Sequence, residues 1–168
     1  SWRDDASAKL PEPMPSPEDF ATLQYTGGTT GLPKGVNITH GQMSVNLSQR
    51  EAFLPTRLDN ETVICIMPLF HVFASSMCLH LTAYCRGRLV ILARYRPDVV
   101  LDTIENEKIT RLPAGPTVFN GLMGFEGFET RDFSSLVTAY SGSAPLPEET
   151  LKRWEKITGC PILEGYGQ

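Results

Sequence analysis

The first residues whose types are suited to chemistry lie in the segment LQYTGGTTGLPKGV, residues 23–36. Its glycines let the backbone take positive φ angles and let another molecule approach the main chain closely. Its hydroxyl groups and the Lys34 ammonium group are hydrogen-bond donors, and successive backbone N–H groups in such a loop form a concave anion site. These features predict a polyphosphate-binding loop, and the alternative from composition alone is a plain flexible hairpin tip.

The segment differs from the P-loop pattern G-x-x-x-x-G-K-[ST], which leads into a helix. Here Lys34 follows a proline and precedes a glycine. The flanking segments TLQY and GVNIT have the composition of short strands, so residues 20–38 are predicted to form a β-hairpin with the loop at its tip. Thr39 is the predicted N-cap of a helix over residues 40–53.

The full order of residues from Tyr25 to Gly35, YTGGTTGLPKG, resembles the signature loop of the adenylate-forming superfamily, Y-T-S-G-T-T-G-x-P-K-G. This superfamily includes acyl-CoA synthetases, the adenylation domains of peptide synthetases and beetle luciferases. Gly27, where serine is commonest, resembles the fatty-acyl-CoA synthetase branch. The resemblance implies that the loop closes over the β- and γ-phosphates of ATP and that Lys34 is catalytic. The nucleotide-binding residues it implies are Thr26, Gly27, Gly28, Thr29, Thr30, Gly31 and Lys34.

Three further segments resemble motifs of the same superfamily. MPLFHVFA, residues 67–74, resembles P-L-x-H-x-x-G/A, which implies a second catalytic residue, His71, near the reacting carboxylate. SGSAPLP, residues 141–147, resembles S-G-G/A-A-P-L, whose backbone passes over the adenine. EGYGQ, residues 164–168, resembles the start of Y-G-x-T-E, whose tyrosine stacks on the adenine. The nucleotide-contacting residues implied by the last two segments are Gly142, Ser143, Ala144, Pro145, Glu164, Gly165, Tyr166 and Gly167.

These segments also have ordinary structural interpretations. His71 could be a partly buried histidine between a strand and a helix, and Pro145 with Leu146 could simply begin a helix. Two departures from the superfamily pattern matter as well. Ser143 stands where glycine or alanine is common, and the Thr and Glu of the Y-G-x-T-E motif would lie past Gln168. In the superfamily that Glu holds Mg²⁺, so no metal ligand is assigned within this chain.

RLPAGPTVFNGLM, residues 111–123, resembles the segment that lines the acyl pocket of the superfamily. Its small apolar residues leave a slot suited to a hydrocarbon chain, and it has no acidic residue to meet an amino-acid ammonium group. The predicted substrate is therefore a fatty or aryl acid, although a buried helix start would have a similar composition. The predicted pocket residues are His71, Ala114, Gly115 and Val118, and Gly121 is a further small residue of the segment.

The resemblance implies an ATP-dependent acyl-CoA synthetase. A carboxylate attacks the α-phosphorus of ATP and expels pyrophosphate, which gives an acyl-adenylate, and the thiol of coenzyme A then displaces AMP. The implied cofactors are ATP, Mg²⁺ and coenzyme A. The implied partners are a small carboxylic acid and the superfamily's C-terminal lid domain, which is expected to lie outside this chain. The chain alone is expected to be inactive or nearly so.

Two alternative functions remain open at this point. A fatty-acyl-AMP ligase, or an adenylation domain that loads a carrier protein, would use the same first half-reaction and differ in the acceptor of the acyl group. A non-catalytic nucleotide-binding module would use the loop for binding alone, and the intact loop with Lys34 argues against a degenerate site.

From residue 62 onward, short apolar segments alternate with segments of helical pattern, such as Leu151, Trp154 and Ile157 before Gly159. This alternation predicts an α/β fold in which a five-stranded, mainly parallel sheet has helices on both faces. The predicted strands are 62–69, 87–92, 109–115, 134–143 and 160–167, and the predicted helices between them are 74–86, 96–108, 116–125 and 145–159.

The predicted organisation has three parts. Residues 1–19 form a connector, residues 20–57 form the phosphate-loop hairpin plus a helix, and residues 58–168 form a truncated α/β subdomain. Together they are expected to be a piece of the large domain of an acyl-CoA synthetase-like enzyme. Ligands bind at the carboxyl ends of the strands in such folds, and PLFHVFA, PAGPT, SGSAP and EGYGQ all follow predicted strands.

Composition sets limits on partners and compartment. The 168 residues have a net charge of −4, which is unfavourable for a nucleic-acid partner, and no apolar run reaches the roughly 18 residues of a membrane span. The N-terminal segment has no apolar core of a signal peptide. The four cysteines form no C-x-x-C pair and suit free thiols in a reducing cytoplasm, and Cys78, His80 and Cys85 lack the spacing of a zinc site.

Overall fold

The computed structural model describes residues 12–26 and 31–167. The chain divides into two compact units at the bond between Phe53 and Leu54, close to the predicted boundary after residue 57. The part up to Phe53 is called the hairpin unit below, and the part from Leu54 onward is called the sheet unit.

The hairpin unit contains β1 (Phe20–Thr26), β2 (Lys34–Thr39) and α1 (His40–Phe53). β1 and β2 pair in antiparallel fashion, which confirms the predicted hairpin. Thr39 is confirmed as the cap of α1, because its hydroxyl accepts the Gln42 N–H at 3.3 Å while the Gln42 side chain accepts the Thr39 N–H at 2.9 Å. This reciprocal pair is a capping box, which satisfies two backbone donors at the start of the helix.

The sheet unit has five strands, which alternate with helices in the described residues. The strands are β3 (Thr62–Cys65), β4 (Arg88–Ile91), β5 (Arg111–Ala114), β6 (Thr138–Ser141) and β7 (Ile162–Glu164). The helices are α2 (Val72–Ala74), η1 (Ser75–His80), α3 (Leu81–Tyr84), α4 (Pro97–Asn106), α5 (Pro116–Met123), η2 (Phe128–Thr130) and α6 (Glu148–Thr158).

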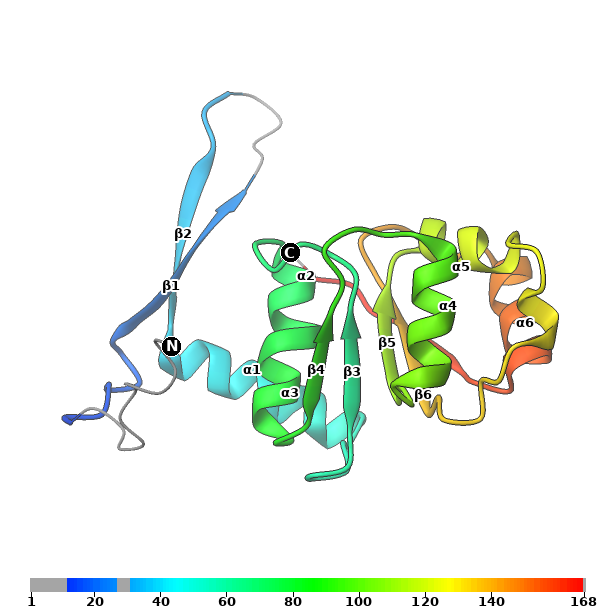
Figure 1. Ribbon diagram of the computed structural model, residues 1–168. Coiled ribbons are helices and arrows are strands. Elements are labelled where there is room, and N and C mark those ends of the chain that lie inside the picture. The colour runs from blue at the N-terminus through cyan, green and yellow to red at the C-terminus, as the bar shows by residue number, and fades with distance from the viewer. Residues whose placement is uncertain (1–11, 27–30, 168) are drawn as a thin grey trace. The chain divides into compact units, whose positions relative to one another are not determined.

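The neighbouring strands β4-β3-β5-β6-β7 of the described sheet all pair in parallel, so the five-stranded α/β prediction is confirmed (Figure 1). The strands are shorter than predicted. β3 ends at Cys65, opposite the last residue of β4, and Pro68 beyond it has no N–H to pair. After β3 the chain forms β4 on one side of β3, and it then crosses to the other side to form β5. The switch point of the sheet therefore lies between β3 and β5.

Helices cover both faces of the sheet, because the side chains of each strand alternate between two separate cores. Ile64 packs in one core with residues of α4, α5 and α6. Val63 and Cys65 pack in the other core with residues of η1 and α3. The helices change face between β4 and α4, as expected at a switch point.

The predicted helix over residues 74–86 forms as one helical run from Val72 to Tyr84, but its middle part, η1, is a π-helix. A spacing of 3.6 residues does not predict the wider i→i+5 turn of a π-helix. α5 begins at Pro116, and α6 ends before Gly159 at φ 69°, as the sequence predicts. All four cysteines are buried, and none of them forms a disulfide.

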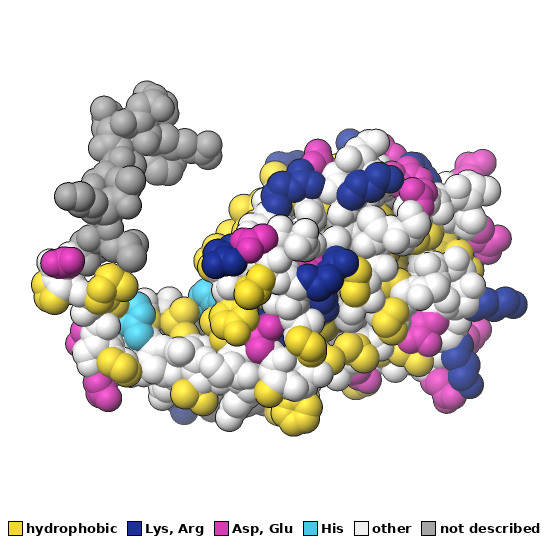
Figure 2. Space-filling model, turned by 90° about the horizontal axis from the view of Figure 1, so that it is seen from below, with side chains coloured by type: hydrophobic (Ala, Val, Ile, Leu, Met, Phe, Trp, Pro, Cys, Tyr) yellow, Lys and Arg dark blue, Asp and Glu magenta, His cyan; other side chains and the backbone are white. Residues whose placement is uncertain are grey.

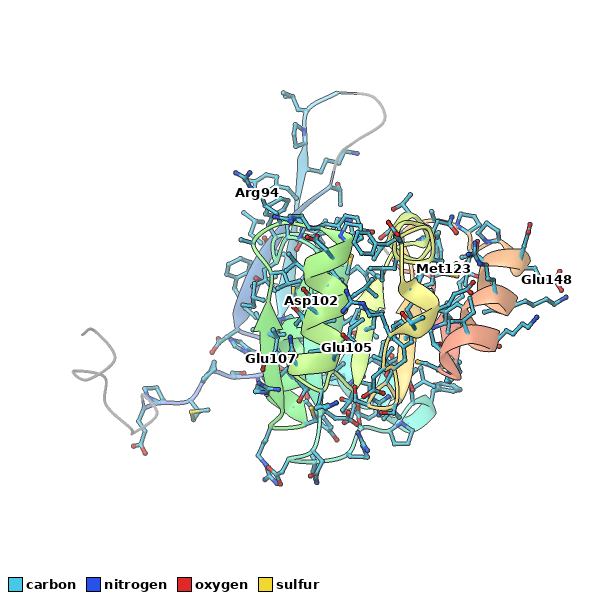
Figure 3. The ribbon with its side chains drawn as sticks, turned by 45° about the vertical axis from the view of Figure 1, so that its right-hand side comes forward. Arg94, Asp102, Glu105, Glu107, Met123 and Glu148 are labelled. Atoms are coloured by element: carbon cyan, nitrogen blue, oxygen red, sulfur yellow. The ribbon has the colours of Figure 1, made fainter. Side chains whose placement is uncertain are left out.

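The surface bears charges of both signs. On the face shown in Figure 2, basic and acidic side chains are interspersed over the sheet unit. Figure 3 shows Asp102 and Glu105 on α4 and Glu107 directly after it, and Arg131 pairs with Asp102 and Glu105 at 2.7 Å each. Within the described ranges, no helix is long and apolar enough to cross a membrane.

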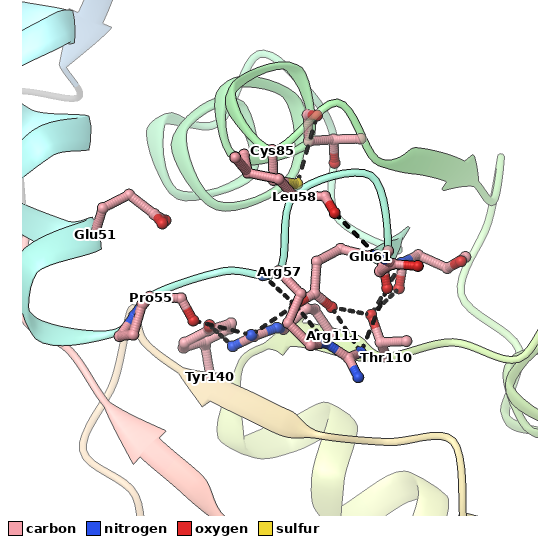
Figure 4. A network of polar contacts seen from close by, with 12 residues as sticks. Glu51, Pro55, Arg57, Leu58, Glu61, Cys85, Thr110, Arg111 and Tyr140 are labelled. Atoms are coloured by element: carbon pink, nitrogen blue, oxygen red, sulfur yellow. Dashed lines mark hydrogen bonds and ion pairs between the residues drawn. The ribbon is translucent and has the colours of Figure 1, made fainter.

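A buried network of polar side chains lies at the amino ends of β3 and β5 (Figure 4). The Glu61 carboxylate accepts hydrogen bonds from Arg111 Nη2 at 2.7 Å, from the Arg57 backbone and guanidinium, and from the Thr110 hydroxyl. Arg111 also donates from Nη1 to the Tyr140 hydroxyl at 2.7 Å. The Glu61 side chain is fully buried and the Arg111 side chain is 5% exposed, so this is a buried ion pair with its hydrogen bonds satisfied on the carboxylate side.

Burial alone would raise the pKa of Glu61, but the hydrogen bonds from Arg111, Arg57 and Thr110 outweigh it and lower the pKa from 4.5 to about 2. A carboxyl with a lowered pKa stabilises the fold above its unfolded pKa, and this stabilisation is lost as the pH falls through the folded pKa. We therefore expect the contribution of Glu61, about 3 kcal/mol, to disappear between pH 4.5 and 2.

Urea unfolding of the wild type and of Glu61→Gln across that range measures this contribution, since other carboxyl groups titrate equally in both proteins. The difference in unfolding free energy between them should shrink as the pH falls. A difference that stays constant from pH 5 to pH 2.5 would contradict the assignment of the lowered pKa to Glu61.

Candidate functional site

Four loops at the carboxyl ends of the strands contain the predicted site residues of the sheet unit. The loop after β3 contains His71, the residue after β5 is Gly115, the loop after β6 begins with Gly142, and Gly165 follows β7. In a parallel sheet all these ends lie on one edge. The first two loops flank the switch point, where open α/β sheets bind their ligands.

His71 is the N-cap of α2, and its Nδ1 atom accepts the backbone N–H of Phe73 at 3.2 Å. In the neutral ring the proton must then lie on Nε2. The His71 side chain is exposed, so this Nε2–H is the donor that it can offer to a ligand. The helix start thus sets the tautomer of the predicted catalytic histidine.

Phe73 meets the loop after β6. A Cβ atom on Gly142 would lie 3.1 Å from the Phe73 Cζ atom and 3.3 Å from both neighbouring ring carbons. Only a residue without a side chain lets the ring approach the backbone this closely without a shift. The contact joins the segment of His71 to the segment predicted to line the adenine. The sequence alone did not predict this contact, and its only sign there is an aromatic residue two positions after the histidine.

The loop after β6 contains the predicted adenine segment, Gly142, Ser143, Ala144 and Pro145, and it is exposed from Ser143 to Pro145. Ser143 has φ 69°, a left-handed conformation that is uncommon for residues other than glycine. This explains why glycine suits the position. The Glu164 carboxylate accepts the Leu146 N–H at 2.9 Å and so ties the loop to the end of β7.

The segment after β7 begins with a backbone hydrogen bond from the Gly165 N–H to the Ser141 carbonyl at 2.9 Å. Tyr166 follows, and its side chain is 91% exposed. An exposed aromatic ring beside the carboxyl edge has a free face on which a base could stack. Gly167 is exposed as well.

The predicted acyl-pocket residues do not all line open space. Ala114 has no exposed surface and belongs to the core, while Gly115 and Val118 are partly buried. The space beside Gly121 is filled by Tyr95, whose hydroxyl oxygen stands where a Cβ atom of residue 121 would be and donates to the Val118 carbonyl at 3.3 Å. Burial raises the pKa of Tyr95. Tyr95 therefore closes the slot that the small residues suggested at this point.

The hairpin unit contains the other predicted residues. Thr26 and Lys34 pair across the two strands, and the Thr26 hydroxyl donates to the Lys34 carbonyl at 3.4 Å. Gly31 has φ 148°, which favours glycine. Gly27, Gly28, Thr29 and Thr30 lie outside the described residues.

The carboxyl edge of the sheet brings together the segments of His71, Gly115, Gly142 and Gly165, which are far apart in the sequence. Lys34 belongs to the other unit. Within the part of the chain that the structure describes, no group of three or more His, Cys, Asp or Glu side chains could hold a metal ion.

The model of a family described as "AMP-binding enzyme" matches residues 1–168, which is the whole chain. A curated relative, the long-chain-fatty-acid–CoA ligase of Bacillus subtilis, is 37% identical over 157 residues, which are 92% of this chain. The chain spans only 28% of the length of that relative.

Solved structures agree with this match. The inhibitor-bound N-terminal domain of FACL13 from Mycobacterium tuberculosis is 25% identical, with a TM-score of 0.81 over 92% of this chain and 39% of that one. The anthranilate CoA ligase AuaEII in complex with anthranoyl-AMP is 27% identical, with a TM-score of 0.86 over 99% of this chain and 33% of that one.

Proposed function

The chain belongs to the AMP-binding enzyme family, and from that premise we propose that it is part of an ATP-dependent acyl-CoA synthetase that activates a long-chain fatty acid. The observation on which this depends most is the meeting of four segments at the carboxyl edge of one parallel sheet, each of which resembles a superfamily motif. The likeness to a long-chain-fatty-acid–CoA ligase supports the choice of acid, and free, buried thiols suit a reducing cytoplasm.

The residues of this edge fit a nucleotide. The Phe73 ring packs against the bare backbone of Gly142, and the residues that follow, from Ser143 to Pro145, are exposed. Tyr166 offers an exposed aromatic face. In this proposal Mg²⁺ arrives bound to the phosphates of ATP.

Each unit has a distinct task in the proposed reaction. In the hairpin unit, Lys34 and the glycine-rich loop would neutralise the β- and γ-phosphates and the pyrophosphate as it leaves. In the sheet unit, the His71 Nε2–H would donate to a carboxylate oxygen of the fatty acid and orient it for attack on the α-phosphorus. The thiol of coenzyme A would then displace AMP from the acyl-adenylate.

Calorimetric titration with Mg-ATP and with a palmitoyl-sulfamoyl-adenosine, which mimics the acyl-adenylate, tests this proposal. Both ligands should bind the wild type. Lys34→Ala should weaken Mg-ATP by about 10- to 100-fold, because it removes a charged hydrogen-bond donor to phosphate, and should leave the analogue unaffected because it has no pyrophosphate.

Lys152→Ala, an exposed lysine on α6 that pairs with Glu148, is the matched control and should change neither affinity. Failure of the folded wild type to bind either ligand would contradict the proposal. In the longer protein of which the chain is proposed to be a part, acyl-CoA formation from palmitate, ATP and coenzyme A, compared with acylation of a carrier protein, separates the synthetase from the carrier-loading alternative.

A further inference from the structure

Ser141 is the last residue of β6 and lies between the ends of two neighbouring strands. It is opposite Ala114 of β5 and opposite Glu164 of β7, and its carbonyl accepts the Gly165 N–H. The next residue is Gly142, which meets Phe73. Ser141 thus lies on the carboxyl edge to which the proposed function assigns the adenylate.

The hydroxyl of Ser141 is buried without a partner. The residue is 1% exposed, and its Oγ atom makes no hydrogen bond to any described residue. Two other buried hydroxyls of the sheet unit have partners: Thr82 donates to the Cys78 carbonyl at 2.6 Å and Thr150 to the Asn120 side chain at 2.9 Å. A buried hydroxyl without a partner destabilises a protein, so this serine lowers the stability of the free chain.

The position of the hydroxyl suggests its use. Ser141 immediately precedes a loop whose residues from Ser143 to Pro145 are exposed and belong to no helix or strand. Such a loop can shift without breaking a helix or a strand. The Ser141 hydroxyl oxygen has no accessible surface here, so a ligand can reach it only after the loop has shifted. Buried polar groups without a partner are few in native proteins, and a functional role is one of the recognised explanations for them.

We infer that Ser141 is a further nucleotide-binding residue, whose hydroxyl is uncommitted in the free chain and forms a hydrogen bond to the nucleotide part of the bound adenylate. The inference rests on the proposed function. It has a consequence that an ordinary structural serine would not have. Removing the hydroxyl should weaken binding and at the same time leave the free chain as stable as before, or more stable.

The test compares Ser141→Ala with Ser135→Ala. Ser135 is the matched control because its hydroxyl has a partner, the Ile109 carbonyl at 2.9 Å, and because it lies before β6, whereas Ser141 is the last residue of that strand. Urea unfolding and titration with AMP and with palmitoyl-sulfamoyl-adenosine are measured for both variants. Ser141→Ala should bind both ligands about tenfold more weakly, with an unchanged or higher urea midpoint. Ser135→Ala should have a lower midpoint and wild-type affinity.

Two results would overturn the inference while leaving the proposed function intact. One is wild-type affinity of Ser141→Ala for AMP, and the other is a fall in its urea midpoint as large as that of Ser135→Ala. If the wild type itself binds neither ligand, the proposed function fails and the inference fails with it.

Discussion

Replacing Arg111 by methionine is expected to lower the free energy of unfolding by about 3–5 kcal/mol. The side chain is 5% exposed and donates to Glu61, to the Tyr140 hydroxyl and to the Pro55 carbonyl. Its loss leaves the Glu61 carboxylate buried with its closest cationic partner removed, and a buried charge without its counter-charge is costly. Urea unfolding at pH 7, followed by circular dichroism, measures the change.

The double variant Glu61→Leu with Arg111→Met is the decisive control. Removing both charges avoids the uncompensated carboxylate, so the double variant should be closer in stability to the wild type than Arg111→Met alone. If Arg111→Met costs less than about 1 kcal/mol, as exposed ion pairs do, the pair is not a buried one. Because the network ties Pro55 to β5, loss of the pair should also loosen the segment just after α1, visible as faster amide hydrogen exchange there.

Replacing Trp154 by alanine is expected to cost about 3–5 kcal/mol. Trp154 has no exposed surface, and its ring lies 5.0 Å from that of Phe119 in an edge-to-face arrangement. It also contacts Phe128 at 5.7 Å and Phe133 at 6.0 Å between ring centroids. The substitution would remove the centre of an aromatic cluster that joins α5, α6 and η2, and the neighbouring elements can refill only part of the cavity.

Tyr166→Ala provides the comparison for this prediction. Its ring is 91% exposed, so its removal should change the unfolding free energy by no more than about 0.5 kcal/mol. Thermal unfolding of both variants, with the wild type, gives the two values. Equal losses for the two aromatic residues would contradict the assignment of the stabilising core to the α5–α6 side of the sheet.

Much of the fold that surrounds the candidate site could be predicted, because it depends on short contiguous segments. The hairpin, the cap at Thr39, the start of α5 at Pro116 and the stop of α6 at Gly159 depend on interactions within a few residues, and the structure has all four. The slot suggested beside Gly121 could not be judged in this way, because Tyr95, which fills it, comes from the loop after β4.

The sequence by itself determined the succession of strands and helices in the sheet unit and the family to which the chain belongs, since apolar periodicity and ordered motifs are local properties of a chain. Only the tertiary structure decided that β3 lies between β4 and β5, because a right-handed crossover can place the next strand on either side according to the face its helix covers. That choice pairs Glu61 with Arg111. The tertiary structure also decided that Ser141 is buried without a hydrogen-bond partner, whereas Ser135 has one. The sequence cannot show this difference, because the partners of a buried hydroxyl are set by the distant groups that the fold brings near.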